Sequence, residues 1–252
     1  MNISNRPIGL YDSGIGGISV LHEAMRQMPN EFYVYYGDHA NVPYGTKTPQ
    51  QIKSFVYPVL DFLMQKQIKA LVVACNTITN VMIEEIRAYL PIPVVGMEPA
   101  IMPAARNSSG LIVALATPAT VSMPKYHNLV LKSKMPERIL SVPCPGLTEL
   151  IEEDAPDDAV MQYLERTVPQ GARNPAVVVL GCTHYVFRRK VIAQFFGSVP
   201  LQDGNAGTVR RLHDLLVGNS LVTTADVGQV VAYSSLPQKQ EAILKRIADT
   251  DY

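Results

Sequence analysis

The sequence is poor in cysteine, in net charge and in long apolar runs. Its 252 residues include three cysteines, and both Lys plus Arg and Asp plus Glu number 22. Three scattered thiols without a Cys-x-x-Cys spacing exclude a disulfide framework and favour free thiols in a reducing compartment. Balanced charge without a basic stripe argues against nucleic acid or an anionic membrane surface as a partner.

No apolar run reaches the roughly 20 residues that a membrane-spanning helix needs. The first residues also lack the charged segment, apolar core and small-residue cleavage site of a secretory signal. We therefore expect a cytoplasmic protein with no membrane partner. Because 47% of the residues are hydrophobic, the chain can bury one large core or two smaller ones.

Short apolar runs alternate with amphipathic segments along the chain. The apolar runs predict strands at residues 7–11, 32–36, 71–74, 94–96, 111–116, 139–142, 177–180 and 201–203. The amphipathic segments predict helices at residues 17–27, 49–66, 79–89, 121–132, 157–166, 185–196, 208–216 and 238–247. This alternation is typical of right-handed strand–helix–strand units, so we expect an α/β fold with mostly parallel sheets.

Two breaks in composition, at residues 90–99 and 203–207, indicate crossings between domains. They predict two similar α/β domains that face each other across a central cleft holding the active site. The first domain comprises residues 1–97 plus 205–252, and the second comprises residues 98–204. The similarity between LVVACNT and VVVLGCTHY supports two related halves.

Two strand-like runs end in a cysteine. Cys75 follows one buried run and precedes the start of a helix, whose amino end stabilises a thiolate. Cys182 follows another run, two residues before His184. A single cysteine is more often a small buried apolar residue than a nucleophile, but the carboxyl ends of parallel strands are where such sheets bind ligands. Cys144 lacks polar neighbours, and we interpret it as structural.

Loops after the first two strands carry further polar groups. Residues 11–17, YDSGIGG, contain glycines that let the backbone approach a ligand closely. Ser19 occupies the third glycine position of the G-x-G-x-x-G pattern, which weakens a dinucleotide interpretation. In the loop at residues 37–45, His39 has no partner visible in the sequence, and we expect no catalytic role for it.

A pair of thiols without a histidine–carboxylate triad suits a reaction that needs two bases. Inversion of a stereocentre by proton transfer requires one group to remove the α-proton and another to deliver a proton to the opposite face. Thiols can occupy both protonation states when their pKa is tuned near ambient pH. The sequence shows no metal-ligand spacing and no lysine in a Schiff-base motif, so we expect neither a metal nor an organic cofactor.

Five motifs resemble, in order and spacing, those of the glutamate racemases, within the cofactor-independent aspartate/glutamate racemase superfamily. They are Asp12-Ser13-Gly14-x-Gly16-Gly17, Val42-Pro43-Tyr44-Gly45, Ala74-Cys75-Asn76-Thr77, Glu98-Pro99 and Gly181-Cys182-Thr183-His184-Tyr185. The resemblance covers nearly the whole chain. It implies two α/β domains around one active site, no pyridoxal phosphate, and interconversion of L-glutamate and D-glutamate for peptidoglycan. It also implies a homodimer.

The same resemblance implies roles for individual residues. Cys75 and Cys182 match the two catalytic acid–bases, and Asp12 and His184 match the side chains that assist the thiols. The positions that match substrate contacts are Asp12, Ser13, Pro43, Tyr44, Gly45, Cys75, Asn76, Thr77, Thr117, Thr120, Cys182, Thr183 and His184.

Some positions depart from the family pattern. Glu152 falls where the family keeps an assisting catalytic carboxylate, with Glu149 and Glu153 as alternatives in the same segment. Residues 38–41 read Asp-His-Ala-Asn instead of Asp-Thr-Ala-Arg, and Val186 replaces a proline. None of these changes removes a group that the chemistry needs.

Other functions remain as alternatives at this point. A racemase of aspartate or another amino acid would keep both thiols, so substrate assays are needed to distinguish it. A one-base decarboxylase would not need the second thiol. An inactive homologue that binds an acidic ligand would not need either of them, and a thiol redox protein would favour a local Cys-x-x-Cys.

Overall fold

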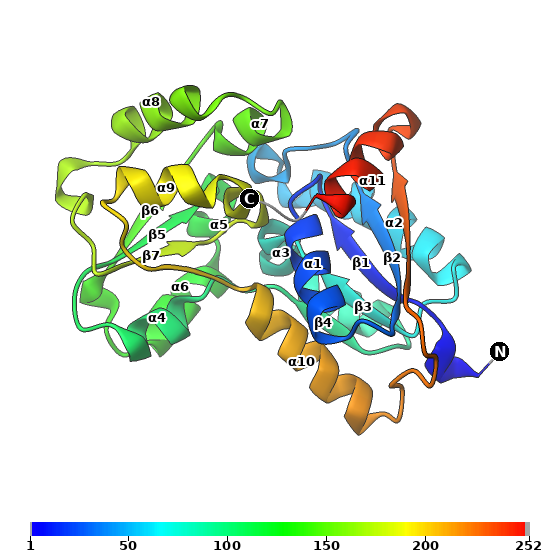
Figure 1. Cartoon of the computed structure of the whole chain (residues 1–252). Coiled ribbons are helices and arrows are strands. Elements are labelled where there is room, and N and C mark those ends of the chain that lie inside the picture. Colours follow the sequence, from blue (N-terminus) through cyan, green and yellow to red (C-terminus); the bar gives the residue numbers. More distant parts are fainter. Residues whose placement is uncertain (1, 250–252) are drawn as a thin grey trace.

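The computed structural model describes residues 2–249, which form two parallel sheets flanked by helices (Figure 1). The first sheet has the order β4-β3-β1-β2-β9, with bounds Val94–Gly96, Ala70–Val73, Ile8–Asp12, Phe32–Gly37 and Gln229–Ser234. The second has the order β6-β5-β7-β8, with bounds Ile139–Pro143, Ile112–Ala116, Val177–Leu180 and Leu201–Asp203. All pairings between these strands are parallel. The predicted α/β class is confirmed.

We call each sheet with its covering helices a lobe. The helices of the first lobe are α1 (Ile18–Gln27), α2 (Pro49–Gln65), α3 (Asn76–Tyr89), α10 (Asn205–Gly218) and α11 (Gln240–Ala248). Those of the second lobe are α4 (Ile101–Asn107), α5 (Pro118–Ser122), α6 (Pro124–Lys132), α7 (Leu147–Glu152), α8 (Asp157–Thr167) and α9 (Arg189–Phe195). Short 3-10 turns span Ile3–Asn5, Tyr44–Thr46, Pro136–Arg138, Gln170–Ala172, Thr183–Arg188 and Pro237–Lys239.

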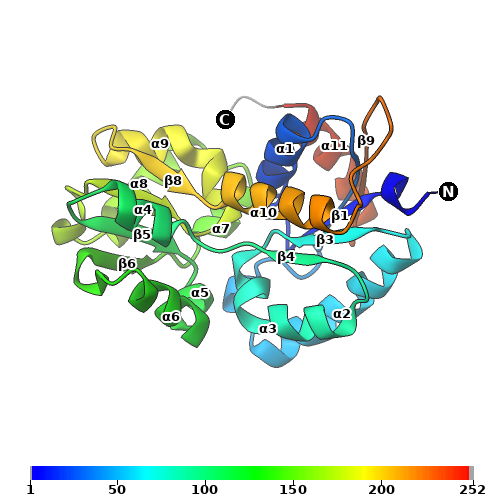
Figure 2. The same cartoon turned by 90° about the horizontal axis from the view of Figure 1, so that it is seen from below.

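Both faces of the first sheet are buried, which explains why its strands are continuously apolar. Leu10 and Val72 contribute to the core beneath α1 and α10, whereas Tyr11 and Val73 contribute to the core beneath α2 and α3. Figure 2 shows α1 and α11 on one side of this sheet and α2 and α3 on the other. In the second sheet, Val113 and Val178 face α7–α9, and Ala114 and Val179 face α4.

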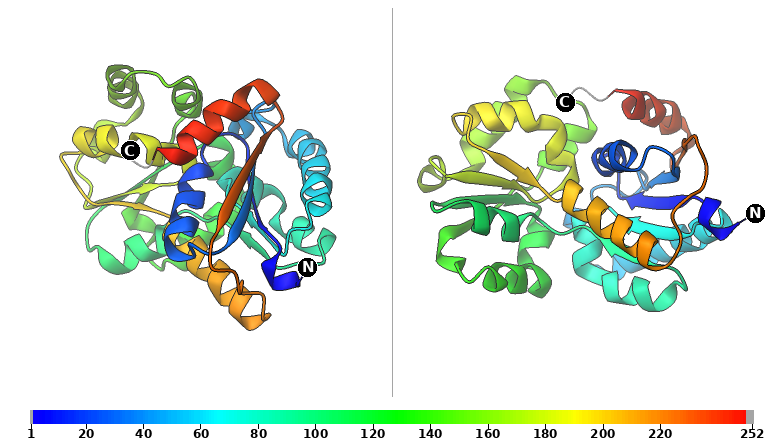
Figure 3. Two further views of the ribbon diagram at one scale, coloured as in Figure 1. Left: turned by 45° about the vertical axis from the view of Figure 1, so that its right-hand side comes forward. Right: turned by 60° about the horizontal axis from the view of Figure 1, so that its bottom comes forward.

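The chain crosses between the lobes twice, after β4 and between β8 and α10. Figure 3 shows α10 leaving the second lobe and extending along the first. The two crossings touch, because a methyl group at Gly204 would collide with the carbonyl oxygen of Glu98 and the sulfur of Met97. The crossings fall at the predicted composition breaks, while the domain boundaries themselves stay a prediction.

The structure corrects the sequence prediction at three places. Strand β9 was not predicted; it is an edge strand with only Ala232 fully buried, so its apolar signal is short. The single helix expected at residues 121–132 is two helices, because Pro124 has no amide hydrogen to continue α5. The segment 185–196 begins as a 3-10 turn, and α9 starts only at Arg189. No helix within residues 2–249 has the length and apolar character to cross a membrane.

A buried ion pair connects the N-terminal segment and the loop before β9 to the first lobe. The ammonium of Lys69 lies 2.5 Å from Oε2 of Glu31 and 2.5 Å from the carbonyl oxygen of Ser4. The other oxygen of Glu31 accepts from the amide of Thr223 at 3.0 Å. We expect Lys69→Met to lower the free energy of unfolding by about 3 to 5 kcal/mol, because it leaves a buried carboxylate unpaired.

Urea unfolding of the purified variants measures this loss. Lys53→Met is the matched control, because Lys53 pairs with Glu85 at 2.6 Å on the surface. Such exposed pairs contribute about 1 kcal/mol or less. If both variants lose the same free energy of unfolding, the buried pair does not contribute more to stability than the exposed one.

Candidate active site

The two thiols that follow the predicted strands lie at the seam between the lobes. Cys75 follows β3 and precedes α3, and Cys182 follows β7 and precedes the turn at Thr183–Arg188. Both are buried. They line one small pocket with about 10 Å³ of free space, which we call the thiol pocket. Its other lining residues are Ser13, Pro43, Tyr44, Gly45, Asn76, Thr77, Thr117, Thr148, Thr183 and His184.

Hydrogen bonds join the two lobes around this pocket. The hydroxyl of Thr183 donates to Oδ2 of Asp12 at 3.1 Å, and the hydroxyls of Thr77 and Thr117 lie 3.3 Å apart. The amide of Ile15 donates to the carboxylate of Glu152 at 2.8 Å. Each of these contacts links a residue of one lobe to a residue of the other, so the side chains of both sheets form one site.

On its side of the pocket, Cys75 is buried beside a hydroxyl and near a carboxylate. The sulfur lies 3.6 Å from the hydroxyl of Ser13, which comes from the loop after β1. Burial raises the pKa of the Cys75 thiol to about 12, and the negative charge of Asp12 adds to this rise. Cys75 is therefore protonated at neutral pH in the pocket as it stands.

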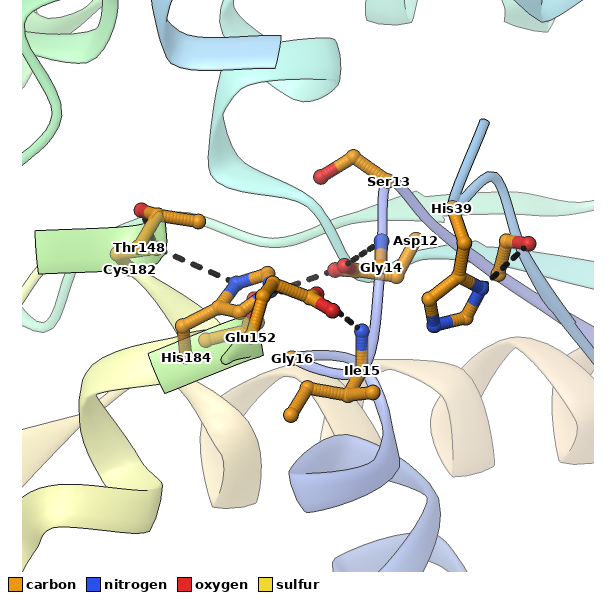
Figure 4. Close-up of polar contacts among 12 residues, drawn as sticks. Asp12, Ser13, Gly14, Ile15, Gly16, His39, Thr148, Glu152, Cys182 and His184 are labelled. Carbon is orange, nitrogen blue, oxygen red and sulfur yellow. Dashed lines mark hydrogen bonds and ion pairs between the residues drawn. The ribbon is translucent and has the colours of Figure 1, made fainter. Parts of the chain in front are cut away.

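The Cys182 side carries a chain of titratable groups (Figure 4). Nδ1 of His184 lies 3.7 Å from the sulfur of Cys182, and Nε2 lies 2.6 Å from Oε1 of Glu152. Burial alone would lower the pKa of His184, but the hydrogen bonds and charges of Cys182 and Glu152 raise it well above its usual range. His184 is therefore an imidazolium held between a sulfur and a carboxylate.

Asp12 lies behind the glycine loop that follows β1. It is fully buried, and Oδ1 accepts from the amide of Gly14 at 3.0 Å. Burial raises the pKa of this carboxyl, although the positive charge of His184 opposes the rise. Asp12 thus orients Thr183 and the loop, and it does not itself line the thiol pocket.

A separate network holds the loop that carries Pro43, Tyr44 and Gly45. The hydroxyl of Tyr44 donates to Oδ2 of Asp38 at 2.5 Å and lies 2.8 Å from the hydroxyl of Tyr11. Asp38 is buried beneath the loop. This network holds the part of the pocket wall that Pro43, Tyr44 and Gly45 form.

The structure brings nearly all of the predicted site residues to the pocket. Three of them do not line it. Asp12 contacts Thr183, Glu152 contacts His184, and Thr120 is fully buried and accepts from the hydroxyl of Thr117 at 3.0 Å. Sequence reasoning missed Thr148, whose hydroxyl lies 3.9 Å from the sulfur of Cys182. Its place shortly after β6, at the edge where the other strand-end side chains lie, was the available signal.

The His184–Glu152 pair gives a pH window for stability. The pKa of Glu152 is lowered from 4.5: burial would raise it, but the hydrogen bond and charge of His184 lower it. Its contribution is present above pH 4.5 and is lost as pH falls through the folded pKa. The pKa of His184 is raised above 6.5, so its contribution is full below pH 6.5 and is lost as pH rises through the folded value.

We therefore expect Glu152→Gln to destabilise the protein most between about pH 4.5 and 6.5. The measurement is the difference in unfolding free energy between wild type and variant, by urea titration across pH 3 to 9. A difference that stays constant with pH would contradict a charged pair.

Comparison with known proteins places this arrangement in a family. Residues 13–212 match the family Asp/Glu/hydantoin racemase. A glutamate racemase of Clostridium perfringens is 41% identical over 245 residues, covering 95% of this chain and 94% of that one.

Two solved structures have the same architecture. Glutamate racemase from Francisella tularensis in complex with D-glutamate has a TM-score of 0.82 at 29% identity, covering 98% of this chain and 95% of that one. Escherichia coli glutamate racemase in complex with L-glutamate and the activator UDP-MurNAc-Ala has a TM-score of 0.83 at 30% identity, covering 96% and 95%. With its paired sheets and a thiol from each, the chain belongs to the Asp/Glu/hydantoin racemase family.

Proposed function

We propose that this protein is a glutamate racemase, an isomerase that interconverts L-glutamate and D-glutamate without pyridoxal phosphate. The observation that carries the proposal is the thiol pocket, in which Cys75 of one lobe and Cys182 of the other line the same space. The Francisella and Escherichia relatives, with D-glutamate and L-glutamate bound, support glutamate as the substrate.

In the proposed reaction, one sulfur acts as a base while the other acts as an acid. A thiolate removes the α-proton, so a C–H bond breaks and an S–H bond forms. The opposite thiol then delivers its proton to the other face of the carbanion, and the two sulfurs exchange protonation states. In the free protein Cys75 holds a proton and an imidazolium lies beside Cys182, the arrangement in which Cys182 removes the substrate proton and Cys75 supplies one.

The carbanion needs charges held on the substrate's ammonium and carboxylates. Asn76 lines the pocket, and its Oδ1 has no hydrogen-bond partner within residues 2–249, so we assign it to the ammonium group. The amino end of α3 and the hydroxyls of Ser13, Thr77 and Thr183 are suited to the carboxylates. Asp12, His184 and Glu152 are the side chains that assist the two thiols.

The proposal extends to the biological setting. A glutamate racemase in the cytoplasm would supply D-glutamate for peptidoglycan, and the resemblance to the family supports a homodimer. The lobes would correspond to domains of residues 1–97 plus 205–252 and residues 98–204, as the two crossings between the sheets suggest.

The test is incubation of the purified protein with L-glutamate in deuterated buffer without added pyridoxal phosphate. Circular dichroism follows inversion, and NMR follows replacement of the α-proton by deuterium. Loss of optical activity with deuterium at the α-carbon is the expected result. Exchange with aspartate but not with glutamate would identify aspartate as the substrate and keep the protein a racemase. Exchange with neither would contradict racemase activity and favour an inactive ligand-binding protein.

A further inference from the structure

Cys182 has a second polar contact, to which the proposed reaction gives no role. The hydroxyl of Thr148 lies 3.9 Å from its sulfur, and Nδ1 of His184 lies 3.7 Å from it. In Figure 4 these two groups approach Cys182 from different elements, Thr148 from α7 and His184 from the turn that follows β7. The sulfur is therefore in contact with a neutral hydroxyl as well as with the imidazolium.

Thr148 occupies a position of α7 that faces the interior of the second lobe. The helix buries Leu147, Thr148 and Ile151, and Thr148 is 5% exposed. A buried hydroxyl costs free energy unless it has a hydrogen-bond partner. Besides the sulfur, its polar neighbour is the hydroxyl of Tyr185, which donates its own proton to a backbone carbonyl oxygen at 3.4 Å. The hydroxyl of Thr148 can therefore donate to the sulfur.

The other thiol has a neighbour of the same kind. The hydroxyl of Ser13 lies 3.6 Å from the sulfur of Cys75. In each lobe a hydroxyl that follows a different strand thus lies against the thiol, Ser13 after β1 and Thr148 after β6. In a two-base reaction each sulfur alternates between thiolate and thiol. A hydroxyl suits both states, because it can donate to a thiolate and accept from an S–H group.

We propose that Thr148 is a positioning residue for Cys182, whose hydroxyl donates to the thiolate and holds the sulfur in place for proton transfer. The inference rests on the proposed function and adds a residue that acts through Cys182. A hydrogen bond to a charged acceptor is stronger than one between neutral groups. The contact therefore favours the thiolate over the thiol, and removal of the hydroxyl moves the protonation of Cys182 to higher pH.

Other titratable groups also act on Cys182, but a substitution at Thr148 replaces none of them. They are His184 and Tyr185 on its own turn, Glu152 on α7, Cys144 after β6, and Asp12, Tyr44 and Cys75 from the first lobe. A difference between variants with and without the hydroxyl at this position therefore reports the hydroxyl itself.

The test measures kcat/KM for glutamate from about pH 5 to 10 in wild type, Thr148→Val and Thr148→Ser. Valine keeps the shape of the side chain and removes the hydroxyl, whereas serine keeps the hydroxyl. We expect the acid-side midpoint of kcat/KM to rise by about one pH unit in Thr148→Val, with the alkaline side unchanged. On the acid slope kcat/KM then falls about tenfold. Thr148→Ser should keep the wild-type midpoint, and Thr148→Ala, a second variant without the hydroxyl, should shift it as valine does.

Thr208→Val is the matched control for the loss of a hydroxyl beside sulfur. Thr208 is also buried, and its hydroxyl donates to the sulfur of Met97 at 3.3 Å, outside the thiol pocket. The same substitution there removes a hydroxyl–sulfur contact and leaves Cys182 untouched. We expect its pH profile to match that of wild type.

The outcomes separate this role from the proposed function. If wild type racemises glutamate and the midpoint is unchanged in both hydroxyl-free variants, the inference is overturned and the proposed function stands. A fall in kcat/KM by the same factor at every pH, in Thr148→Ser as well as Thr148→Val, would also overturn it, since that pattern reports altered packing. Absence of racemisation in wild type would instead overturn the proposed function, and the role of Thr148 with it.

Discussion

Replacement of either Cys75 or Cys182 by alanine is expected to reduce racemisation of glutamate by at least about a thousandfold, the scale of losing an essential acid–base group. Each thiol serves one face of the substrate, so the remaining sulfur cannot complete the inversion alone. The loss should be equal in the two directions, because the equilibrium between enantiomers is fixed by symmetry. Circular dichroism with L-glutamate and then with D-glutamate measures both.

Cys144→Ala provides the matched control for these variants. Cys144 is also a buried free thiol at the end of a strand of the second sheet, but it does not line the thiol pocket. Burial raises the pKa of its thiol to about 12, as it does for Cys75, so the two thiols differ in position and not in acidity. Near-normal activity in Cys144→Ala would show that the losses in the other two variants depend on the position of the thiol in the pocket. Full activity in either Cys75→Ala or Cys182→Ala would exclude the two-thiol scheme.

Gly16→Ala is expected to lower kcat/KM by about a hundredfold, because displacements of about 1 Å in a catalytic group can cost this much. Gly16 belongs to the loop after β1, where it faces the second lobe. A methyl group there would collide with the hydroxyl of Thr183 and with Nδ1 of His184. The loop or these two side chains would have to shift, although the substitution removes no functional group.

Gly207→Ala controls for the general effect of adding a methyl group. Gly207 lies in α10, and a methyl group there meets no atom within 4 Å. We expect unchanged kinetics and a stability gain of about 0.5 to 1 kcal/mol from the better helix propensity. If Gly16→Ala has the same kcat/KM as wild type, the prediction is wrong. The loop after β1 would then accommodate the methyl group without displacing His184.

Much of this site could be predicted because its residues follow strongly apolar strands. The runs before Cys75 and Cys182 are buried on both faces, so their ends were recognisable without knowledge of the packing. The helix predicted at residues 49–66 begins at Pro49 in the structure, where Thr48 and Gln51 form a capping box. Local signals were sufficient wherever a residue and its partner are close in the chain.

The remainder depends on contacts between distant segments. Thr148 reaches Cys182 only because α7 packs beside the turn at Thr183–Arg188, and residues 143–156 carry no strong pattern. His39 was expected to be a loop residue without a role. Its environment is set by Ser234 on β9, a strand that sequence reasoning did not find. Because β9 was not predicted, the surroundings of His39 could not be predicted either.

The small free volume of the thiol pocket has a consequence for affinity. With about 10 Å³ free, the pocket has room for about one water molecule and does not admit an amino acid as it stands. Glutamate would bind a more open minority form, so the apparent dissociation constant equals the intrinsic one divided by the open fraction. Strengthening the contacts between Thr183 and Asp12 across the seam would then raise the melting temperature and weaken apparent binding together. Selection for a stable resting molecule and selection for tight substrate capture would oppose each other at these residues.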